Sequence, residues 1–353
     1  MGYQLTIEPL GETIEVAEGQ TLLDACLRNG IYLPYQCNHG LCGTCKVAVL
    51  DGDVDHAASS PFALMDFERE EGRTLACCAR PLSDVIIEAD VEEDPDAEHH
   101  PVQDVTATVE AMDDLTPDIK AVWLRVPGDG LPFQAGQYVN LHLPGLEEPR
   151  AFSIASAPSD PTLLELQVRR VPGGVGTAYI HERLAVGDRL DLSGPLGRFH
   201  VHKSQTAPML FLAGGSGLSS PKSMVLDLLS GGWTGPITLI HGVRMTHDVY
   251  DGDLLRELAR RHSNFTYIPA TCQGNEGDGW EGDRGFVHEV AERHFNGNFK
   301  GMKAYLCGPP VMIDACVRSL MKGRLFEKDI HMESFVTKAD SATVTKSPLY
   351  KRI

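Results

Sequence analysis

The chain has 353 residues, enough for two or three domains that each bury a core of their own. No apolar run approaches the ~20 residues that a membrane span requires, and the first residues lack the features of a signal peptide, so we expect a cytoplasmic protein. Most of the net charge of −18 lies in residues 1–100, which hold 20 acidic and 5 basic side chains, and this argues against a nucleic-acid partner.

The first part of the chain has the pattern of a small α+β domain. Residues 3–8 and 13–16 alternate polar and apolar side chains, as the two strands of a half-buried hairpin do. Thr21 is a suitable N-cap for a helix over residues 22–27, and residues 46–50 and 85–87 again resemble strands.

Four cysteines in this part have the spacing of cluster ligands. Cys37, Cys42 and Cys45 form a C-x4-C-x2-C loop and Cys77 follows thirty-two positions later, which is the plant-type pattern for a [2Fe–2S] cluster. Zinc also accepts four thiolates, but it usually takes paired C-x2-C knuckles or Cys/His mixtures. Spacing alone does not choose between Cys77 and Cys78 as the fourth ligand.

Residues 1–94 resemble a plant-type ferredoxin domain, whose fold is the α+β β-grasp. In that family the residue matching Cys77, directly after Leu75-Ala76, is the fourth ligand, so the resemblance implies Cys37, Cys42, Cys45 and Cys77 as the metal site. The stretch up to Pro101 is densely acidic and almost without large apolar side chains, which predicts an acidic linker over residues 95–101.

Residues 102–203 contain short β-type runs separated by turn-rich pieces. Many short strands with regular turns predict a closed antiparallel barrel or a sandwich. The runs are residues 105–112, 119–126, 138–143, 150–154, 163–169 and 189–193.

Two motifs within this region suggest a flavin site. Arg150-Ala151-Phe152-Ser153-Ile154 offers a cation, a ring and a hydroxyl along one strand, although for this motif alone an ordinary strand is the better explanation. A glycine-rich turn precedes an expected helix over residues 178–184, and free N–H groups at such a turn favour an anion. Together the motifs resemble the antiparallel β-barrel FAD domain of the ferredoxin–NADP reductase superfamily. That resemblance implies FAD contacts from Arg150, Phe152, Ser153, Ile154, Gly174, Gly176 and Thr177.

Residues 204–340 alternate strands and helices. A strand over residues 208–213, a glycine turn and a helix over 221–229 are followed by strand–helix pairs at 237–241 and 254–261, and at 305–306 and 310–322. This alternation predicts an α/β doubly wound domain with ligands at the carboxyl ends of its parallel strands.

Three segments of this region resemble the pyridine-nucleotide motifs of the same superfamily. They imply nucleotide contacts from Gly214, Gly215, Ser216, Gly217, Arg244, Cys307, Gly308 and Pro309, although Cys307 alone could be a buried strand-end residue. The turn before Pro221 is one residue longer than usual in the family. Because little positive charge follows Arg244, we expect NADH rather than NADPH.

The closing segment, with Glu333 and Phe335, resembles the part of the superfamily in which an acid and an aromatic approach the flavin. The resemblance implies Cys307, Glu333 and Phe335 as catalytic residues; a surface strand end is the alternative reading. Residues 341–353 are expected to form a polar C-terminal tail.

The order [2Fe–2S], FAD, NAD describes a protein that takes electron pairs from NADH and passes them on singly. The turn over residues 214–221 (Gly-Gly-Ser-Gly-Leu-Ser-Ser-Pro) and the segment over residues 75–81 (Leu-Ala-Cys-Cys-Ala-Arg-Pro) resemble those of reductase components of bacterial multicomponent phenol hydroxylases. This resemblance implies a separate diiron oxygenase as electron acceptor. Reductases of ring-hydroxylating dioxygenases or of methane and toluene monooxygenases are alternatives with the same module order. A pure electron carrier or redox-sensing binding protein is the alternative from a different class.

Overall fold

The structure is a computed structural model, and it describes residues 2–35, 38, 40–57, 59–91, 94–273 and 279–335. These residues form two compact units, one from residues 2–103 with 194–198 and one from 104–193 with 199–335. Cys37 and the predicted tail lie outside the described residues. No helix in the described ranges has the length and apolarity to traverse a bilayer.

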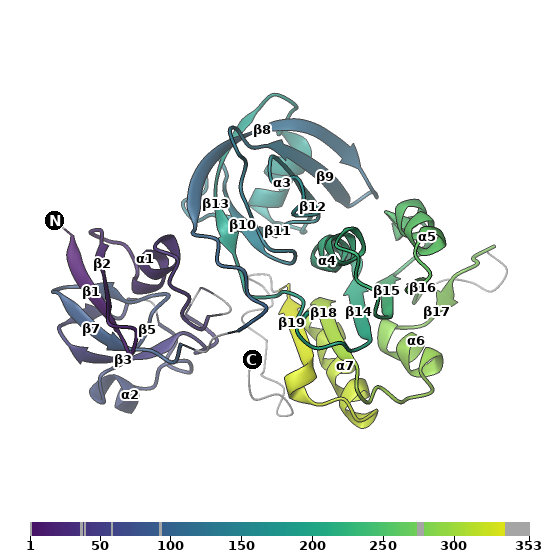
Figure 1. The fold of residues 1–353 in the computed structure, drawn as a ribbon. Coiled ribbons are helices and arrows are strands. Elements are labelled where there is room, and N and C mark those ends of the chain that lie inside the picture. The colour runs from purple at the N-terminus through teal and green to yellow at the C-terminus, as the bar shows by residue number, and fades with distance from the viewer. Residues whose placement is uncertain are drawn as a thin grey trace. The chain divides into compact units, whose positions relative to one another are not determined.

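The first unit is built on a five-stranded mixed sheet in the order β2-β1-β7-β3-β5 (Figure 1). The strands are β1 (Tyr3–Glu8), β2 (Glu12–Val16), β3 (Lys46–Asp51), β5 (Arg73–Leu75) and β7 (Val85–Glu88). β1 runs parallel to β7, whereas the other pairs are antiparallel. Helix α1 (Leu22–Arg28) begins after Thr21, whose hydroxyl accepts a hydrogen bond from the Asp24 N–H, so the predicted cap is confirmed.

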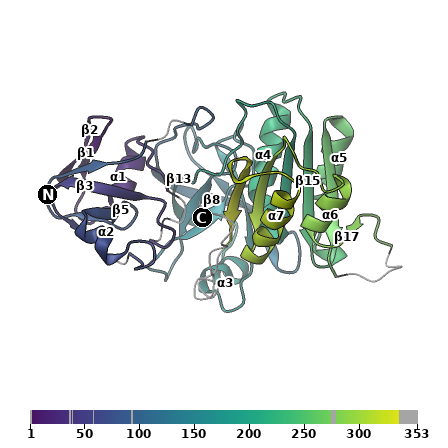
Figure 2. The same ribbon diagram turned by 90° about the horizontal axis from the view of Figure 1, so that it is seen from below.

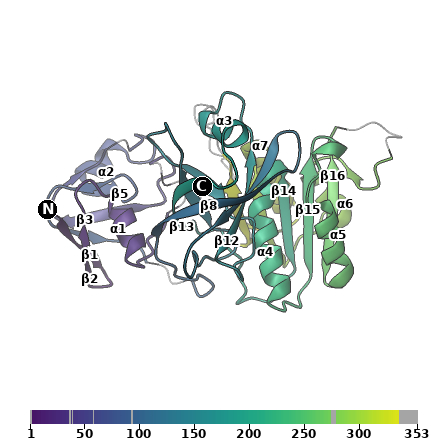
Figure 3. The ribbon, with the colours of Figure 1, turned by 90° about the horizontal axis from the view of Figure 1, so that it is seen from above.

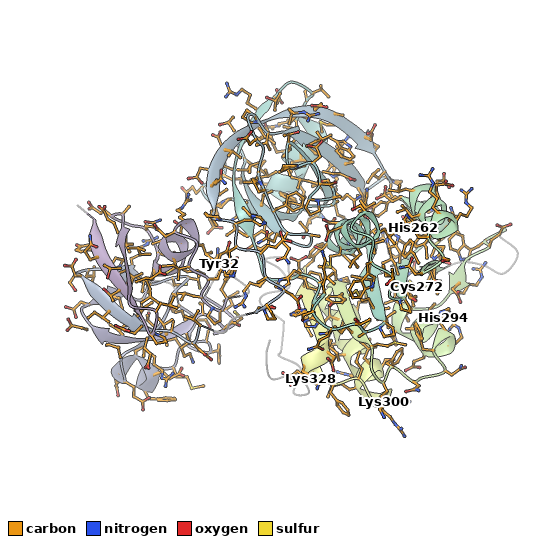
Figure 4. All side chains as sticks on the ribbon, in the orientation of Figure 1. Tyr32, His262, Cys272, His294, Lys300 and Lys328 are labelled. Carbon is orange, nitrogen blue, oxygen red and sulfur yellow. The ribbon has the colours of Figure 1, made fainter. Side chains whose placement is uncertain are left out.

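Shorter elements complete this unit. They are the one-turn helix α2 (Asp66–Glu70) and the two-stranded pair β4 (Val54–Asp55) and β6 (Arg80–Pro81). Part of the predicted linker packs on the unit instead of extending freely. The Tyr32 hydroxyl, labelled in Figure 4, donates to the His100 carbonyl, and its ring meets the His99 ring edge-on at 4.6 Å. The acidic composition of this stretch did not predict the contact, because His99 and His100, and not the acidic residues, make it.

The second unit begins with a six-stranded antiparallel sheet in the order β11-β10-β13-β8-β9-β12. A bridge between Ile154 and Leu166 brings the two edges together, which makes a nearly closed barrel around an aliphatic core. The strands are β8 (Gln103–Asp114), β9 (Ile119–Arg125), β10 (Tyr138–His142), β11 (Arg150–Ser153), β12 (Leu163–Arg169) and β13 (Arg189–Leu196). Helix α3 (Val175–Glu182) starts three residues earlier than predicted, so Gly176 and Thr177 lie in its first turn.

The rest of the unit is a parallel sheet in the order β17-β16-β15-β14-β18-β19. Figure 1 shows α4 and α5 over one face and α6 and α7 over the other; α6 and α7 stand in front of the sheet in Figure 2, and α4 and α5 in Figure 3. The strands are β14 (Met209–Gly214), β15 (Ile237–Val243), β16 (Phe265–Thr271), β17 (Asp283–Arg284), β18 (Lys303–Gly308) and β19 (Ile330–Ser334). The helices are α4 (Ser219–Ser230), α5 (Gly252–Arg261), α6 (Val287–His294) and α7 (Pro310–Lys322), with 3₁₀ turns η1 (Gly215–Leu218), η2 (Thr246–Asp248) and η3 (Glu327–Asp329).

The predicted fold class, with α+β, antiparallel-barrel and doubly wound α/β parts, is therefore confirmed. The sequence missed β16, β17 and α6, and it placed the start of α4 two residues too late. The two serines that lengthen the turn before Pro221 form the first turn of α4, where Ser219 and Ser220 are fully buried. The extra residue is thus absorbed by the helix and does not enlarge the glycine turn.

Candidate functional sites

The cysteine loop has the backbone that a cluster site requires. Gly40 and Gly43 adopt positive φ angles of 71° and 76°, a region that residues with a Cβ avoid. A Cβ on Gly43 would lie 3.2 Å from the Ala63 carbonyl oxygen, so the loop packs closely on the following segment. Larger residues at these positions would open the loop that carries Cys42 and Cys45.

The described cysteine sulfurs of this region gather at one place. The Ala76 N–H donates to the Cys45 carbonyl at 2.9 Å, and the neighbouring Cys77 thiol lowers the pKa of Cys45. The Cys77 and Cys78 sulfurs are 3.7 Å apart, and that contact holds the pKa of Cys78 at about 7. Cys45 and Cys77 are both buried, whereas Cys78 is half-buried. A group of soft thiolates fits an iron–sulfur centre, and Cys77 stays the fourth ligand predicted from the resemblance to plant-type ferredoxins.

The predicted flavin motif lies on β11, at the edge of the barrel beside β10. The Arg150 guanidinium donates to the carbonyl oxygens of Glu148 and Pro149, at 2.8 and 3.0 Å, and stays one-third exposed. The Phe152 ring is half-buried against the barrel core. Ile154 is fully buried there, and its N–H donates to the Gln137 carbonyl, so its side chain belongs to the core.

The second flavin motif sits directly against the first. A Cβ on Gly176 would lie 3.2 Å from the Cγ of Arg150, so the glycine lets α3 approach the strand that carries the arginine. The Thr177 hydroxyl accepts from the Val171 N–H and donates to the carbonyl of Gly174, the N-cap of α3. This fixes the turn so that the unpaired N–H groups of the first helical turn lie close to Arg150. A cation beside a helix N-terminus suits a phosphate-bearing cofactor.

The glycine turn after β14 is shaped for a close backbone approach. A Cβ on Gly217 would lie 2.3 Å from the Cys307 carbonyl oxygen, and one on Gly214 would lie 2.4 Å from Met312 Sδ. Gly215 has φ of +53° and no atom within 4 Å of its Cβ position. The turn is therefore closed on the protein side and open beside Gly215, where a phosphate could approach the main chain.

Two buried side chains fix the backbone of this turn by hydrogen bonds. The Gly215 carbonyl accepts hydrogen bonds from the His241 Nε2–H, at 3.2 Å, and from the Tyr250 hydroxyl, at 2.9 Å. Burial lowers the pKa of His241 to about 4, so the ring is neutral near pH 7 and serves as a donor. The glycine turn has a recognisable sequence pattern, whereas no pattern marks His241 and Tyr250 as its supports.

Two predicted residues, Ser153 and Cys307, and one that the sequence did not indicate, Ser220, converge on the carboxylate of Glu333. Oε2 of Glu333 accepts from the Ser153 hydroxyl at 3.0 Å and from the Ser220 hydroxyl at 2.7 Å, and the Cys307 thiol donates to it at 3.6 Å. Cys307 and Glu333 are direct neighbours in the register of β18 and β19. Burial raises the pKa of Glu333, and burial with the nearby carboxylate raises the pKa of Cys307. These four residues, referred to below as the Glu333 group, thus link the flavin motif to the last strand of the nucleotide domain.

Phe335 and Arg244 are the remaining predicted site residues of the nucleotide domain. The Phe335 N–H donates to the Gly308 carbonyl at 3.0 Å, which places the residue beside the Cys307-Gly308-Pro309 turn. The Arg244 guanidinium lies 3.3 Å from Oδ2 of Asp118, on the barrel, and 3.6 Å from Oδ2 of Asp248. Two carboxylates therefore surround the cation that was expected at the adenosine end.

These features define an iron–sulfur flavoprotein reductase. They are a cysteine site in the first unit, a barrel with a phosphate-binding turn, and a parallel sheet with a glycine turn that suits a nucleotide. Family models match in the same order: the 2Fe-2S iron-sulfur cluster binding domain over residues 5–82, the oxidoreductase FAD-binding domain over 106–201 and the oxidoreductase NAD-binding domain over 211–318. The chain belongs to the family of reductases that combines these three domains. It is an oxidoreductase whose cofactors are FAD and a [2Fe–2S] cluster and whose electron donor is NADH.

Relatives of known identity extend over the whole chain. It is 55% identical to the phenol 2-monooxygenase reductase component DmpP of Pseudomonas sp. (strain CF600), and 52% identical to the phenol hydroxylase P5 protein of Acinetobacter pittii (strain PHEA-2), with 100% of each chain covered in both pairs. The resemblance to phenol hydroxylase reductase components is thereby confirmed. Among solved structures, the Amycolatopsis reductase GcoB has a TM-score of 0.87 at 35% identity, covering 94% of this chain and 98% of its own. The ferredoxin reductase in carbazole 1,9a-dioxygenase has a TM-score of 0.78 at 29% identity, with 95% and 99% covered.

Proposed function

We propose that this chain is the reductase component of a multicomponent phenol hydroxylase and that it delivers electrons from NADH to the diiron oxygenase of that system. The observation that carries the proposal is the 55% identity to a phenol 2-monooxygenase reductase component, with 100% of each chain covered. The aromatic O-demethylase reductase subunit of Amycolatopsis, a relative with a different printed role, is 38% identical.

The chemistry divides between cofactors and chain. When bound, FAD accepts the electron pair of NADH and releases single electrons to the [2Fe–2S] cluster. We assign the cluster to Cys37, Cys42, Cys45 and Cys77. Soft thiolates suit iron, and the three of these residues that the structure describes lie on a loop and a strand end of one unit.

The flavin would be held by Arg150 and the N-terminus of α3 at its phosphates, with Phe152 and Ser153 at the heterocycle. The cation and the free helical N–H groups both favour negative charge, and this supports the phosphate assignment. Ser153 supports the other end of the assignment, since its hydroxyl reaches Glu333 and so adjoins the nucleotide domain.

The nucleotide would bind along the carboxyl ends of β14, β15 and β18. The open side of Gly215 would receive the pyrophosphate, Arg244 the adenosine end, and the Cys307-Gly308-Pro309 turn the nicotinamide. Glu333 holds a carboxyl next to the Cys307 thiol, and Phe335, whose N–H donates to the Gly308 carbonyl, would cover this end of the site. Together they would orient the rings and exclude water during electron transfer.

The proposal is tested by reconstitution. The purified holoprotein is mixed with the oxygenase component of a phenol hydroxylase, NADH and phenol, and catechol is measured together with NADH consumption. Coupled catechol formation is expected. The control replaces that oxygenase with the terminal component of a ring-hydroxylating dioxygenase and its own substrate. Equal or better turnover with the dioxygenase would contradict the assignment to phenol hydroxylase, while dye reduction by NADH would still report an intact reductase.

A further inference from the structure

Lys222 is a buried cation that none of the predicted sites uses. It lies in the first turns of α4, and its side chain is only 5% exposed. Its Nζ is 2.9 Å from both carboxylate oxygens of Glu165 and 2.9 Å from Oδ2 of Asp251. A buried lysine needs such partners, because an unpaired buried charge is strongly destabilising.

The three charged groups come from different parts of the second unit. Glu165 is on β12 of the flavin barrel, whereas Lys222 and Asp251 belong to the nucleotide domain. Gln167, also on β12, donates from Nε2 to Glu165 at 2.8 Å and to Asp251 at 2.7 Å. The cluster therefore joins the two cofactor-binding halves by a closed set of charge-assisted bonds.

The same cluster is next in the chain to Tyr250, one of the two residues that fix the nucleotide turn. Asp251 directly follows Tyr250, whose hydroxyl holds the Gly215 carbonyl. Asp251 itself has φ of +54°, a left-handed conformation that is costly for a residue with a Cβ, and its bonds to Lys222 and Gln167 compensate for that cost.

The helix that carries Lys222 also carries two serines that contact Glu333 and the barrel. Ser220, two residues earlier, donates to Glu333, and Ser223, one residue later, donates to the Ser156 carbonyl of the barrel at 2.6 Å. A shift of this turn of α4 would move the nucleotide turn and the Glu333 group together, relative to the flavin strand.

We propose that Lys222, bound to Glu165 and Asp251, is a positioning residue for electron transfer from NADH to FAD: it sets the distance and angle between the barrel and the nucleotide domain. Lys222 contacts neither cofactor-binding motif itself and acts through α4 and the segment at Asp251. Since a misplacement of about 1 Å between reacting rings can slow a reaction ~100-fold, a loosened joint should reduce the rate of the first half-reaction without removing either cofactor.

The test is Lys222→Met in the FAD- and cluster-loaded protein. In anaerobic stopped-flow experiments with NADH, we expect flavin bleaching at saturating NADH to slow by about 10- to 100-fold. The charge-transfer absorbance of the NADH complex should weaken. The oxidative half-reaction, measured as cytochrome c reduction by photochemically reduced protein, should keep the parent rate. Lys222→Arg should recover part of the lost rate.

The matched control is Lys203→Met, which removes an exposed lysine paired at 2.6 Å with Asp227, near the other end of α4 and outside the Lys222 cluster. It should leave both half-reactions unchanged. Flavin bleaching of Lys222→Met at the parent rate, or equal slowing of both half-reactions, would overturn the proposal. If Lys222→Met does not fold, the triple variant with Glu165→Gln and Asp251→Asn removes the unpaired charges, and the same two rates decide.

Discussion

The Ser153 hydroxyl donates a hydrogen bond across 3.0 Å to Oε2 of Glu333, although 180 residues separate them in the chain. Ser153 ends a barrel strand, and Glu333 lies on the last strand of the nucleotide domain. The bond joins the predicted flavin motif to the predicted nicotinamide turn, and the consequences of altering it can be measured.

Glu333→Gln should slow flavin reduction by NADH by about 10- to 100-fold. The amide oxygen can still accept from Ser153 and Ser220, but the amide carries no charge and cannot exchange a proton as the carboxyl does. FAD content should stay at the parent level. A variant that reduces its flavin at the parent rate would contradict the role given to this carboxyl. Stopped-flow absorbance at saturating NADH provides the measurement.

The same variant has a pH signature in stability. Burial raises the pKa of Glu333 above its usual value of 4.5, so the native state holds this proton more tightly than the unfolded state. The carboxyl therefore costs stability progressively as pH rises from about 4.5 through the raised pKa. The Tm of Glu333→Gln relative to the parent should increase over that range. A difference that does not change with pH would show that the carboxyl is not perturbed.

His241 should limit stability in acid. Burial lowers its pKa from 6.5 to about 4, so stability that is present above pH 6.5 is lost as pH falls towards 4. The loss should amount to about 3 kcal/mol, and His241→Gln, which keeps a donor for the Gly215 carbonyl, should remove it. Urea unfolding of both proteins between pH 4 and 7 gives the comparison, and parallel curves would contradict the prediction.

Coenzyme preference should depend on the acids around Arg244. Asp118 and Asp248 neutralise its guanidinium and would repel a 2′-phosphate. Asp118→Asn with Asp248→Asn should raise kcat/KM for NADPH relative to NADH by about 10-fold, a change of about 1.4 kcal/mol. Asp253→Asn, at an exposed acid of α5, is the control. An unchanged ratio of the two kcat/KM values would assign the preference to other residues.

The cluster ligands can be separated by single substitutions. Cys42→Ser and Cys77→Ser should each lose the cluster, measured as iron and acid-labile sulfide, while NADH still reduces ferricyanide through FAD. Cys78→Ser should retain a full cluster. The opposite result for Cys77 and Cys78 would reverse the assignment of the fourth ligand, and cluster retention in Cys42→Ser would refute the loop assignment.

The parts of the fold that sequence analysis predicted are those that depend on local chemistry. Cysteine spacing, the Thr21 cap and the glycines of the nucleotide turn are fixed by ligand geometry and backbone conformation within a few residues. Strand β16 was missed because Pro269 interrupts its pattern, which usually argues against a central strand.

The Lys222 cluster could not be predicted from the chain. Lys222 is 57 residues from Glu165 and 29 from Asp251, and nothing local marks the three as partners. Their contact depends on how the barrel packs on α4, which is a tertiary property. The support of Gly215 by His241 and Tyr250 was missed for the same reason.

The central claim, that one chain moves electrons from NADH through FAD to a [2Fe–2S] cluster, is tested most directly by an anaerobic NADH titration followed by visible absorption and EPR. We predict that a rhombic reduced-[2Fe–2S] signal grows together with flavin bleaching. Bleaching without that signal in the iron- and sulfide-loaded protein would contradict the account.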